Sequence, residues 1–195
     1  MDSPSGVDRC ACTTLALPPA PVVDEPGLLA LLDTVRAALY PEQADLTIGA
    51  ELVTDLQFFR AWTELDTVGA PPRQRRYVIQ VDPTVLADPP TPVALAAVLA
   101  HELGHVDHYV TLDTDAFVAF AAWYAGEDPL TSAGLAEYER ETDEKSLARG
   151  CAEGLATMRE WIYAHCEGDV EAAKRFQYYS PEEIAAWEEA NGSCR

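Results

Sequence analysis

The amino-acid sequence predicts a mostly helical α+β domain that contains a small β-sheet. The chain has 195 residues, of which 48% are hydrophobic, and this is enough to bury a core of its own. Several segments repeat their apolar residues at the period of an α-helix, whereas β-branched residues typical of strands gather in short segments. No internal repeat divides the chain. We therefore expect one domain over residues 24–195, preceded by a Pro-rich extended arm over residues 1–23.

The first half of the domain is predicted to combine a helix with strands. Asp24 is placed to cap a helix that runs to about Tyr40, and Pro41 ends it. Residues 46–53 have the composition of a strand, while residues 54–65 fit a helix or a strand equally well.

A loop and a second strand precede the most apolar helix. Residues 70–76 form a loop whose basic cluster we expect to face solvent, and residues 77–81 are the clearest strand. Residues 82–90 read as a turn-rich link. Thr91 then caps a helix with Pro92 at its first position and strong helix formers beyond it.

The second half is predicted to be helical. Residues 113–125 carry aromatic residues at helical spacing, and we interpret this stripe (Phe117, Phe120, Ala121 and Tyr124) as core rather than as the wall of a substrate pocket. Ser132 caps a helical region that extends to His165, with a bend near Gly150 or Gly154. Ser180-Pro-Glu-Glu183 is a capping box that starts a final helix.

The stretch His101-Glu-Leu-Gly-His105 lies inside the helix that begins after Thr91. Residues four apart lie on the same face of a helix, so both imidazoles can bind one metal ion. Zinc accepts imidazole nitrogens and lowers the pKa of a bound water. Glu102 is then placed to act as general base and afterwards as proton donor.

A hydrolytic zinc site usually takes three protein ligands, and the sequence offers three candidates for the last one. His108 returns to nearly the same helix face but lies two turns from His101. Glu139 is preferred, because Asp143 lies one turn after it and could accept the free N–H of a ligand histidine. Glu141 is the rival, since a shift of half a turn would exchange it for Glu139.

These residues carry a family resemblance that covers roughly residues 76–150. The run Val98-Leu-Ala-His-Glu-Leu-Gly-His-Val106, followed by Glu139-x-x-x-Asp143, resembles the gluzincin group of zinc metallopeptidases. The resemblance implies a minimal zincin-like domain whose small sheet packs on the active-site helix. It implies zinc ligands His101, His105 and Glu139, the base Glu102 and the supporting Asp143. Residues 76–81 would be the edge strand that lines the substrate cleft.

The group that stabilises the oxyanion of the tetrahedral intermediate is open among three side chains. His165, Tyr109 and Tyr138 have suitable donors, and His165 follows the ligand glutamate in sequence, as the corresponding histidine does in several gluzincins. We include His165 in the candidate catalytic set. A structural histidine is the alternative.

The function expected from the sequence is zinc-dependent hydrolysis of peptide bonds in a peptide or protein substrate. A catalytically silent zinc-binding regulatory module is the alternative, and an acidic interaction protein without metal is a further rival. The net charge of -20 argues against nucleic acid and anionic membranes as partners, and no apolar stretch is long enough for a membrane span. The sequence does not indicate an oligomeric state.

Five cysteines lie near the two ends of the chain and in the last helical region. This placement favours disulfides and an exported protein, although residues 1–12 lack the apolar core of a signal peptide, so that a leader would have to be missing. A cytoplasmic protein with free thiols is the alternative. A leader cysteine that binds the zinc and keeps the enzyme latent is also compatible with the sequence.

Overall fold

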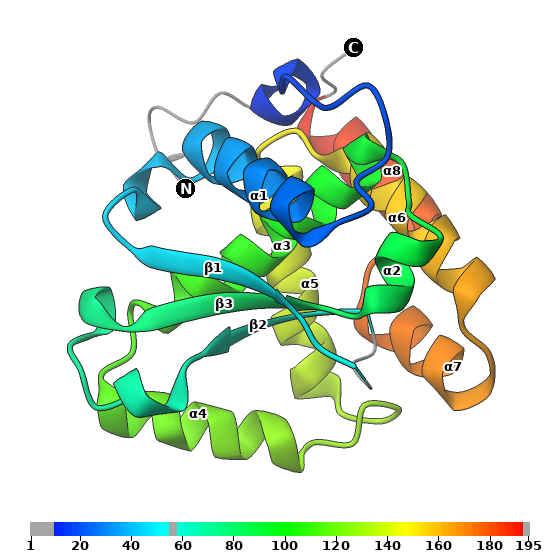
Figure 1. Cartoon of the computed structure of the whole chain (residues 1–195). Helices are drawn as coiled ribbons and strands as arrows, with labels where there is room; N and C mark the ends of the chain where they lie inside the picture. The colour runs from blue at the N-terminus through cyan, green and yellow to red at the C-terminus, as the bar shows by residue number, and fades with distance from the viewer. Residues whose placement is uncertain (1–9, 55–57, 193–195) are drawn as a thin grey trace.

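The computed structural model describes residues 10–54 and 58–192, which form a mostly helical α+β structure with a three-stranded sheet, as predicted. Figure 1 shows the sheet between α1 on the β1 side and α4 beyond β2, with the remaining helices gathered behind and beside it. The helices and strands are α1 (Glu25–Leu39), β1 (Thr47–Leu52), β2 (Phe59–Thr63), β3 (Arg76–Val81), α2 (Pro83–Ala87), α3 (Pro92–Tyr109), α4 (Thr114–Gly126), α5 (Ala133–Leu147), α6 (Ala152–His165), α7 (Gly168–Gln177) and α8 (Pro181–Asn191).

The sheet has the strand order β1-β3-β2, with β3 parallel to β1 and antiparallel to β2. All residues of β3 from Tyr77 to Val81 are buried, and such a continuous buried run is typical of a central strand. The expectation that residues 76–81 form the edge strand is therefore wrong. The edge beside the candidate site is β2, which comes from the segment that the sequence left ambiguous.

Helix α3 is the centre of the fold and is buried on nearly all sides. It packs against α1, α5, α6 and β2. Its many alanines let neighbouring helices approach closely, and Gly154 of α6 does the same from the other side. A Cβ atom at Gly154 would lie 2.5 Å from the backbone oxygen of Val93. This helix pair is therefore in backbone contact, which fixes the position of α3 and of its histidines.

The helix boundaries follow the capping signals in the sequence. The side chain of Asp24 accepts a hydrogen bond from Gly27, and the predicted capping box of Ser180 is present. The predicted helical region between Ser132 and His165 is divided into α5 and α6 at Gly150, whose φ of 83° interrupts the helix. Two helices were not predicted: α2, within the supposed turn-rich link, and α7.

The predicted N-terminal arm and the basic loop are both attached to the core, although the loop was expected to face solvent. In the described part of the N-terminal segment, Cys12 is buried and forms a disulfide with Cys151, at the junction of α5 and α6. The thiol of Cys166 is free. Arg75, from the basic loop, is fully buried, and its guanidinium donates hydrogen bonds to the carbonyl oxygens of Ala70 and Leu112. A guanidinium can be buried when backbone oxygens replace its water.

Candidate metal centre

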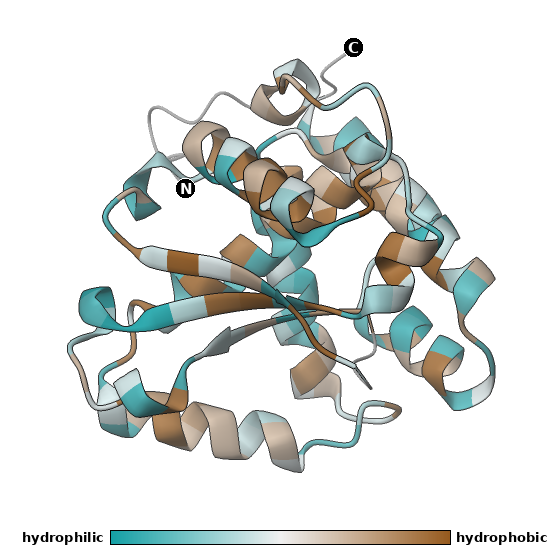
Figure 2. Cartoon of the chain, in the orientation of Figure 1, coloured by the Kyte–Doolittle hydropathy of each residue, from teal (hydrophilic) through white to brown (hydrophobic). Residues whose placement is uncertain are grey.

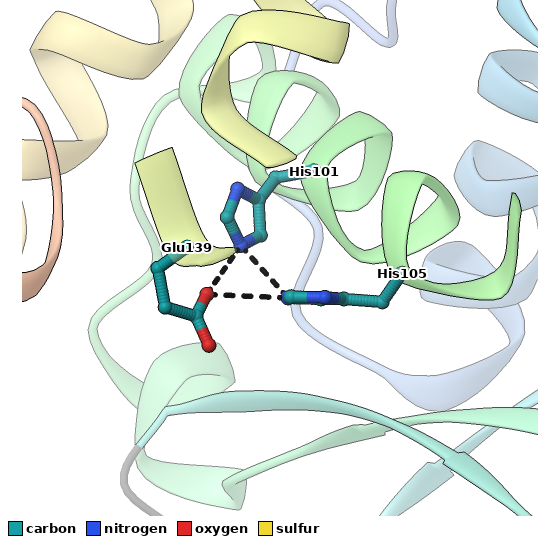
Figure 3. Close-up of side chains that lie close together, drawn as sticks. All are labelled: His101, His105 and Glu139. Carbon is teal, nitrogen blue, oxygen red and sulfur yellow. Dashed lines mark hydrogen bonds and ion pairs between the residues drawn. The ribbon is translucent and has the colours of Figure 1, made fainter. Parts of the chain in front are cut away.

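Three side chains from two helices converge on one point in the interior. His101 and His105 lie one turn apart on α3, and Glu139 approaches from α5 (Figure 3). The Nε2 atoms of the histidines are 3.1 Å apart, and each is 3.3 Å from Oε2 of Glu139. One donor atom from each residue falls within 4.8 Å of the others, and all three residues are buried. The group could hold a metal ion.

The hydrogen bonds around this cluster leave its inward-facing atoms as acceptors. Nδ1 of His101 lies 2.9 Å from a carboxylate oxygen of Asp143, which only accepts, so in the neutral imidazole Nδ1 carries the proton and Nε2 presents a lone pair. Oε2 of Glu139 is buried and has no hydrogen-bond partner. Lone pairs brought together away from water repel one another unless a cation or a proton lies between them. The donor set therefore fits a metal ion.

The electrostatics of the metal-free cluster agree with this reading. Burial alone would lower the pKa of His101, but its hydrogen bond with Asp143 and the carboxylate of Glu139, 3.3 Å from Nε2, raise the pKa to about 9. Burial likewise opposes ionisation of Glu139, yet the two histidines hold its pKa well below the usual range. The cluster therefore attracts positive charge, which a metal ion or a proton can supply.

Glu139, and not Glu141, is the acid that the fold brings to the histidines. Glu139 is 0% exposed, and its other oxygen, Oε1, accepts a hydrogen bond of 2.7 Å from the hydroxyl of Tyr124. Glu141 is exposed on the far side of α5. His108 also stays outside the cluster, where its ring contacts Phe120 and Tyr138.

A second layer of side chains orients the two histidines. Asp143 is fully buried, and its Oδ1 contacts His101. The same oxygen accepts a hydrogen bond of 2.6 Å from Arg159 of α6. Oδ2 accepts a hydrogen bond from the backbone N–H of Tyr179. The hydroxyl of Tyr138 lies 2.8 Å from Nδ1 of His105. Asp143 was expected from the sequence. Arg159 was missed, because nothing local distinguishes it from a solvent-facing arginine.

Glu102 lies beside the cluster in the wall of a pocket of about 510 Å³. The residue is 5% exposed, and its buried Oε2 has no hydrogen-bond partner. The pocket is bounded by residues of β2, α3, α4, α5 and α7, including Lys174, and by Tyr178, which follows α7. A carboxylate without a partner, next to a candidate metal site and open to a pocket, is available to accept a proton.

The aromatic stripe on α4 forms one wall of this pocket, so its interpretation as core is wrong for most of its members. Phe117 is buried, but Phe120 and Ala121 are half-buried and Tyr124 is exposed, and all four residues line the pocket. The rings of Phe117 and Phe120 attach α4 to the rest of the fold, because they contact Tyr109 of α3 and, for Phe120, Tyr138 of α5. Figure 2 shows it in the pale to brown colours of apolar residues along most of its length.

His165 is not brought to the site. It is exposed at the end of α6, where its ring stacks on Trp161 and Nε2 lies 3.0 Å from a carboxylate oxygen of Asp88. These contacts hold it against the segment after α2, and it does not line the pocket. Of the other expected donors, Tyr109 lines the pocket and Tyr138 is hydrogen-bonded to His105.

The disulfide bears on one further expectation. The sulfur of Cys12 is bonded to that of Cys151 and is therefore not a ligand of the metal cluster. In the described ranges, moreover, no helix has the length and hydropathy of a membrane span.

Comparisons of the chain with protein-family models, with curated proteins and with solved structures found no match.

Proposed function

We propose that this protein is a zinc-dependent peptidase of the gluzincin type. One observation carries the proposal: two histidine nitrogens and a carboxylate oxygen converge on a point beside a pocket, and the unpaired carboxylate of Glu102 lies in the wall of that pocket. A module that only binds a metal has no need of a buried, unpaired carboxylate next to it, since such a group costs desolvation energy.

The donor set favours zinc over other common ions. Calcium and magnesium prefer oxygen ligands throughout, whereas zinc readily takes two imidazoles and a carboxylate. Three protein ligands also leave the fourth tetrahedral position open, as catalytic zinc sites do. A zinc ion held here would supply Lewis acidity and lower the pKa of a neighbouring water.

The protein side chains then have separate tasks. Glu102 accepts a proton from the attacking water and passes it to the leaving amine. Asp143 holds His101 in the tautomer whose Nε2 faces the metal, and Tyr138 orients His105 through Nδ1. Tyr124 holds Glu139 through Oε1, which leaves Oε2 for the metal.

The walls of the pocket support an extended polypeptide as the substrate. Strand β2 pairs only with β3 among the described strands, and its residues Phe59–Trp62 line the pocket. Its other edge can accept an added strand except at Ala61, whose carbonyl oxygen accepts a hydrogen bond of 3.4 Å from the hydroxyl of Tyr109. Opposite this edge, the α4 stripe and Leu135 provide an apolar surface for a large side chain. We propose an extended peptide with a bulky apolar residue near the scissile bond.

The test compares the parent protein with Glu102→Gln. Protein purified without added metal should contain zinc in both forms, while hydrolysis of an unstructured protein should fall by about 10²- to 10⁴-fold in the variant, because an amide cannot accept the proton. Glu137→Gln, on the exposed face of α5, is the matched control and should retain activity. Undiminished hydrolysis by Glu102→Gln would contradict the assigned base. Zinc without hydrolysis in the parent would favour the silent metal-binding module.

A further inference from the structure

Lys174 differs from every other lysine and arginine in the described part of the chain. Each of the others donates a hydrogen bond to a carboxylate, an amide oxygen or a backbone carbonyl. Among the described residues, the ammonium group of Lys174 has no hydrogen-bonded or ion-paired acceptor, and its one polar contact is with the ring face of Tyr178, 5.2 Å from the centroid. In a chain with 33 acids and 13 bases, a cation without an acidic partner is unexpected.

The position of Lys174 links it to the candidate site. It lies on α7 and lines the main pocket, together with Glu102, His105 and Glu139. It also lines the smaller cavity beside His101, again with Glu102 and Tyr178. The cation without an acceptor is thus next to the proposed base and the proposed metal ligands.

The surroundings of Lys174 strengthen its interaction with an incoming anion. The side chain is half-buried, and burial lowers its pKa although Glu139 and Glu102 act in the opposite direction. A charge held where water is scarce interacts with an opposite charge more strongly than it would in solution. The ring of Tyr178 contacts both Lys174 and the guanidinium of Arg159, which lies 4.3 Å from the ring centroid, and these cation–π contacts limit the movement of this part of the pocket.

We propose that the ammonium group of Lys174 binds a negatively charged oxygen of the substrate, namely the oxygen of the scissile carbonyl as water adds to it. This inference rests on the proposed peptidase function. Addition of water transfers an electron pair from the carbonyl double bond to this oxygen, and its negative charge has no counterpart in the bound peptide. Lys174 therefore stabilises the transition state more than the ground state, and its removal should lower kcat more than it raises KM.

The experiment measures binding as well as catalysis. Lys174→Met keeps the length of the side chain and removes its charge, Lys174→Arg restores a charge, and Arg175→Met removes one charge from the same helix at a residue paired with Glu171. Binding of a phosphonamidate peptide, whose charged tetrahedral group resembles the hydrated carbonyl, is measured by calorimetry on the zinc-loaded proteins. Lys174→Met should bind it about 10- to 100-fold more weakly, as expected for loss of a charge-assisted hydrogen bond, and Arg175→Met should not.

The kinetic arm uses a peptide with a free C-terminal carboxylate and its amidated form. An oxyanion role predicts the same loss of kcat for both peptides in Lys174→Met, with partial recovery in Lys174→Arg. A rise in KM for the free acid alone would overturn it, since Lys174 would then bind the terminal carboxylate. Equal phosphonamidate affinity in the parent and in Lys174→Met, or none in the zinc-loaded parent, would also overturn it. Lys174-dependent binding without hydrolysis of any peptide would retain Lys174 as an anion-binding group and overturn the proposed peptidase function.

Discussion

The two sides of the pocket are built differently. On the side of the candidate ligands, charged groups are buried and bonded to one another: Glu139 and Asp143 are 0% exposed and Arg159 is 2% exposed. On the opposite side, α4 is apolar yet largely open to solvent, with Val118 54% and Trp123 36% exposed, and Phe117 is its one buried residue. One side relies on fixed polar contacts, whereas the other is a largely apolar helix at the periphery of the fold (Figures 1 and 2).

This difference matches what each side would have to do. A metal site requires donor atoms held within a few tenths of an ångström, which buried hydrogen bonds to backbone and charged groups provide. A surface that accepts several substrate side chains benefits from aromatic residues that can adjust. The contrast predicts that substitutions on the ligand side change metal binding by large factors. Substitutions on α4 should change substrate preference and leave the metal in place, except at Tyr124, whose hydroxyl donates a hydrogen bond to Glu139.

The largest effect is expected for Glu139→Gln, with Glu141→Gln as its matched control. Glu139 offers a buried carboxylate oxygen to the cluster, whereas Glu141 is exposed on the same helix. Loss of a ligand should weaken zinc binding beyond the roughly 100-fold limit seen for outer partners, while Glu141→Gln should bind normally. Chelator competition and elemental analysis measure this. Equal zinc retention by both variants would remove Glu139 from the ligand set.

A smaller effect on the metal is expected for Asp143→Asn, with about 10- to 100-fold weaker zinc binding because His101 loses its charged partner. The structure adds a consequence that the sequence did not indicate. Arg159 would be left buried without a counter-charge, and breaking such a pair destabilises a protein by about 3–5 kcal/mol.

A double variant separates these two effects of Asp143. Asp143→Asn combined with Arg159→Met removes the stranded charge, so thermal stability with saturating zinc should recover, while zinc affinity should remain low. If the single variant binds zinc as tightly as the parent, Asp143 does not support the metal ligand.

The features predicted correctly from the sequence depend on local spacing. The positions of His101 and His105 on one helix face follow from four residues of separation, and the capping residues fixed the starts of α1, α3 and α8. Glu139 was preferred over Glu141 because Asp143 lies one turn after it, and the fold brings both Glu139 and Asp143 to the histidines.

The features that the sequence did not reveal depend on contacts between distant segments. Arg159 and Lys174 lie on helices whose packing against α3 and α5 is not encoded in a short window. Periodicity on α4 indicated which residues share a face, but it could not say whether that face meets a core or a pocket. The edge position of β2 likewise depends on pairing with β3, a partner that follows it by more than ten residues.

The smallest effect, and the one that tests the α4 side directly, is expected for Ala121→Phe compared with Ala122→Phe. The two alanines are adjacent on α4, but Ala121 lines the pocket, whereas Ala122 is exposed and does not. A phenyl ring at position 121 would occupy space that we assign to the substrate side chain.

Two peptides that differ only in Phe or Ala at the residue next to the scissile bond serve as substrates. Ala121→Phe should lower kcat/KM for the Phe peptide by at least about 10-fold, because a few methylene groups in a hydrophobic pocket change discrimination by this much, and it should leave the Ala peptide nearly unaffected. Ala122→Phe should have the same kcat/KM as the parent for both peptides. Zinc content should be the same in all three proteins, since α4 contributes no ligand among the described residues.

If Ala121→Phe lowers kcat/KM equally for both peptides, the added ring disturbs the site as a whole and the α4 wall does not select the substrate side chain. If it slows neither, the substrate does not enter this part of the pocket, and the edge of β2 remains as the surface that positions it.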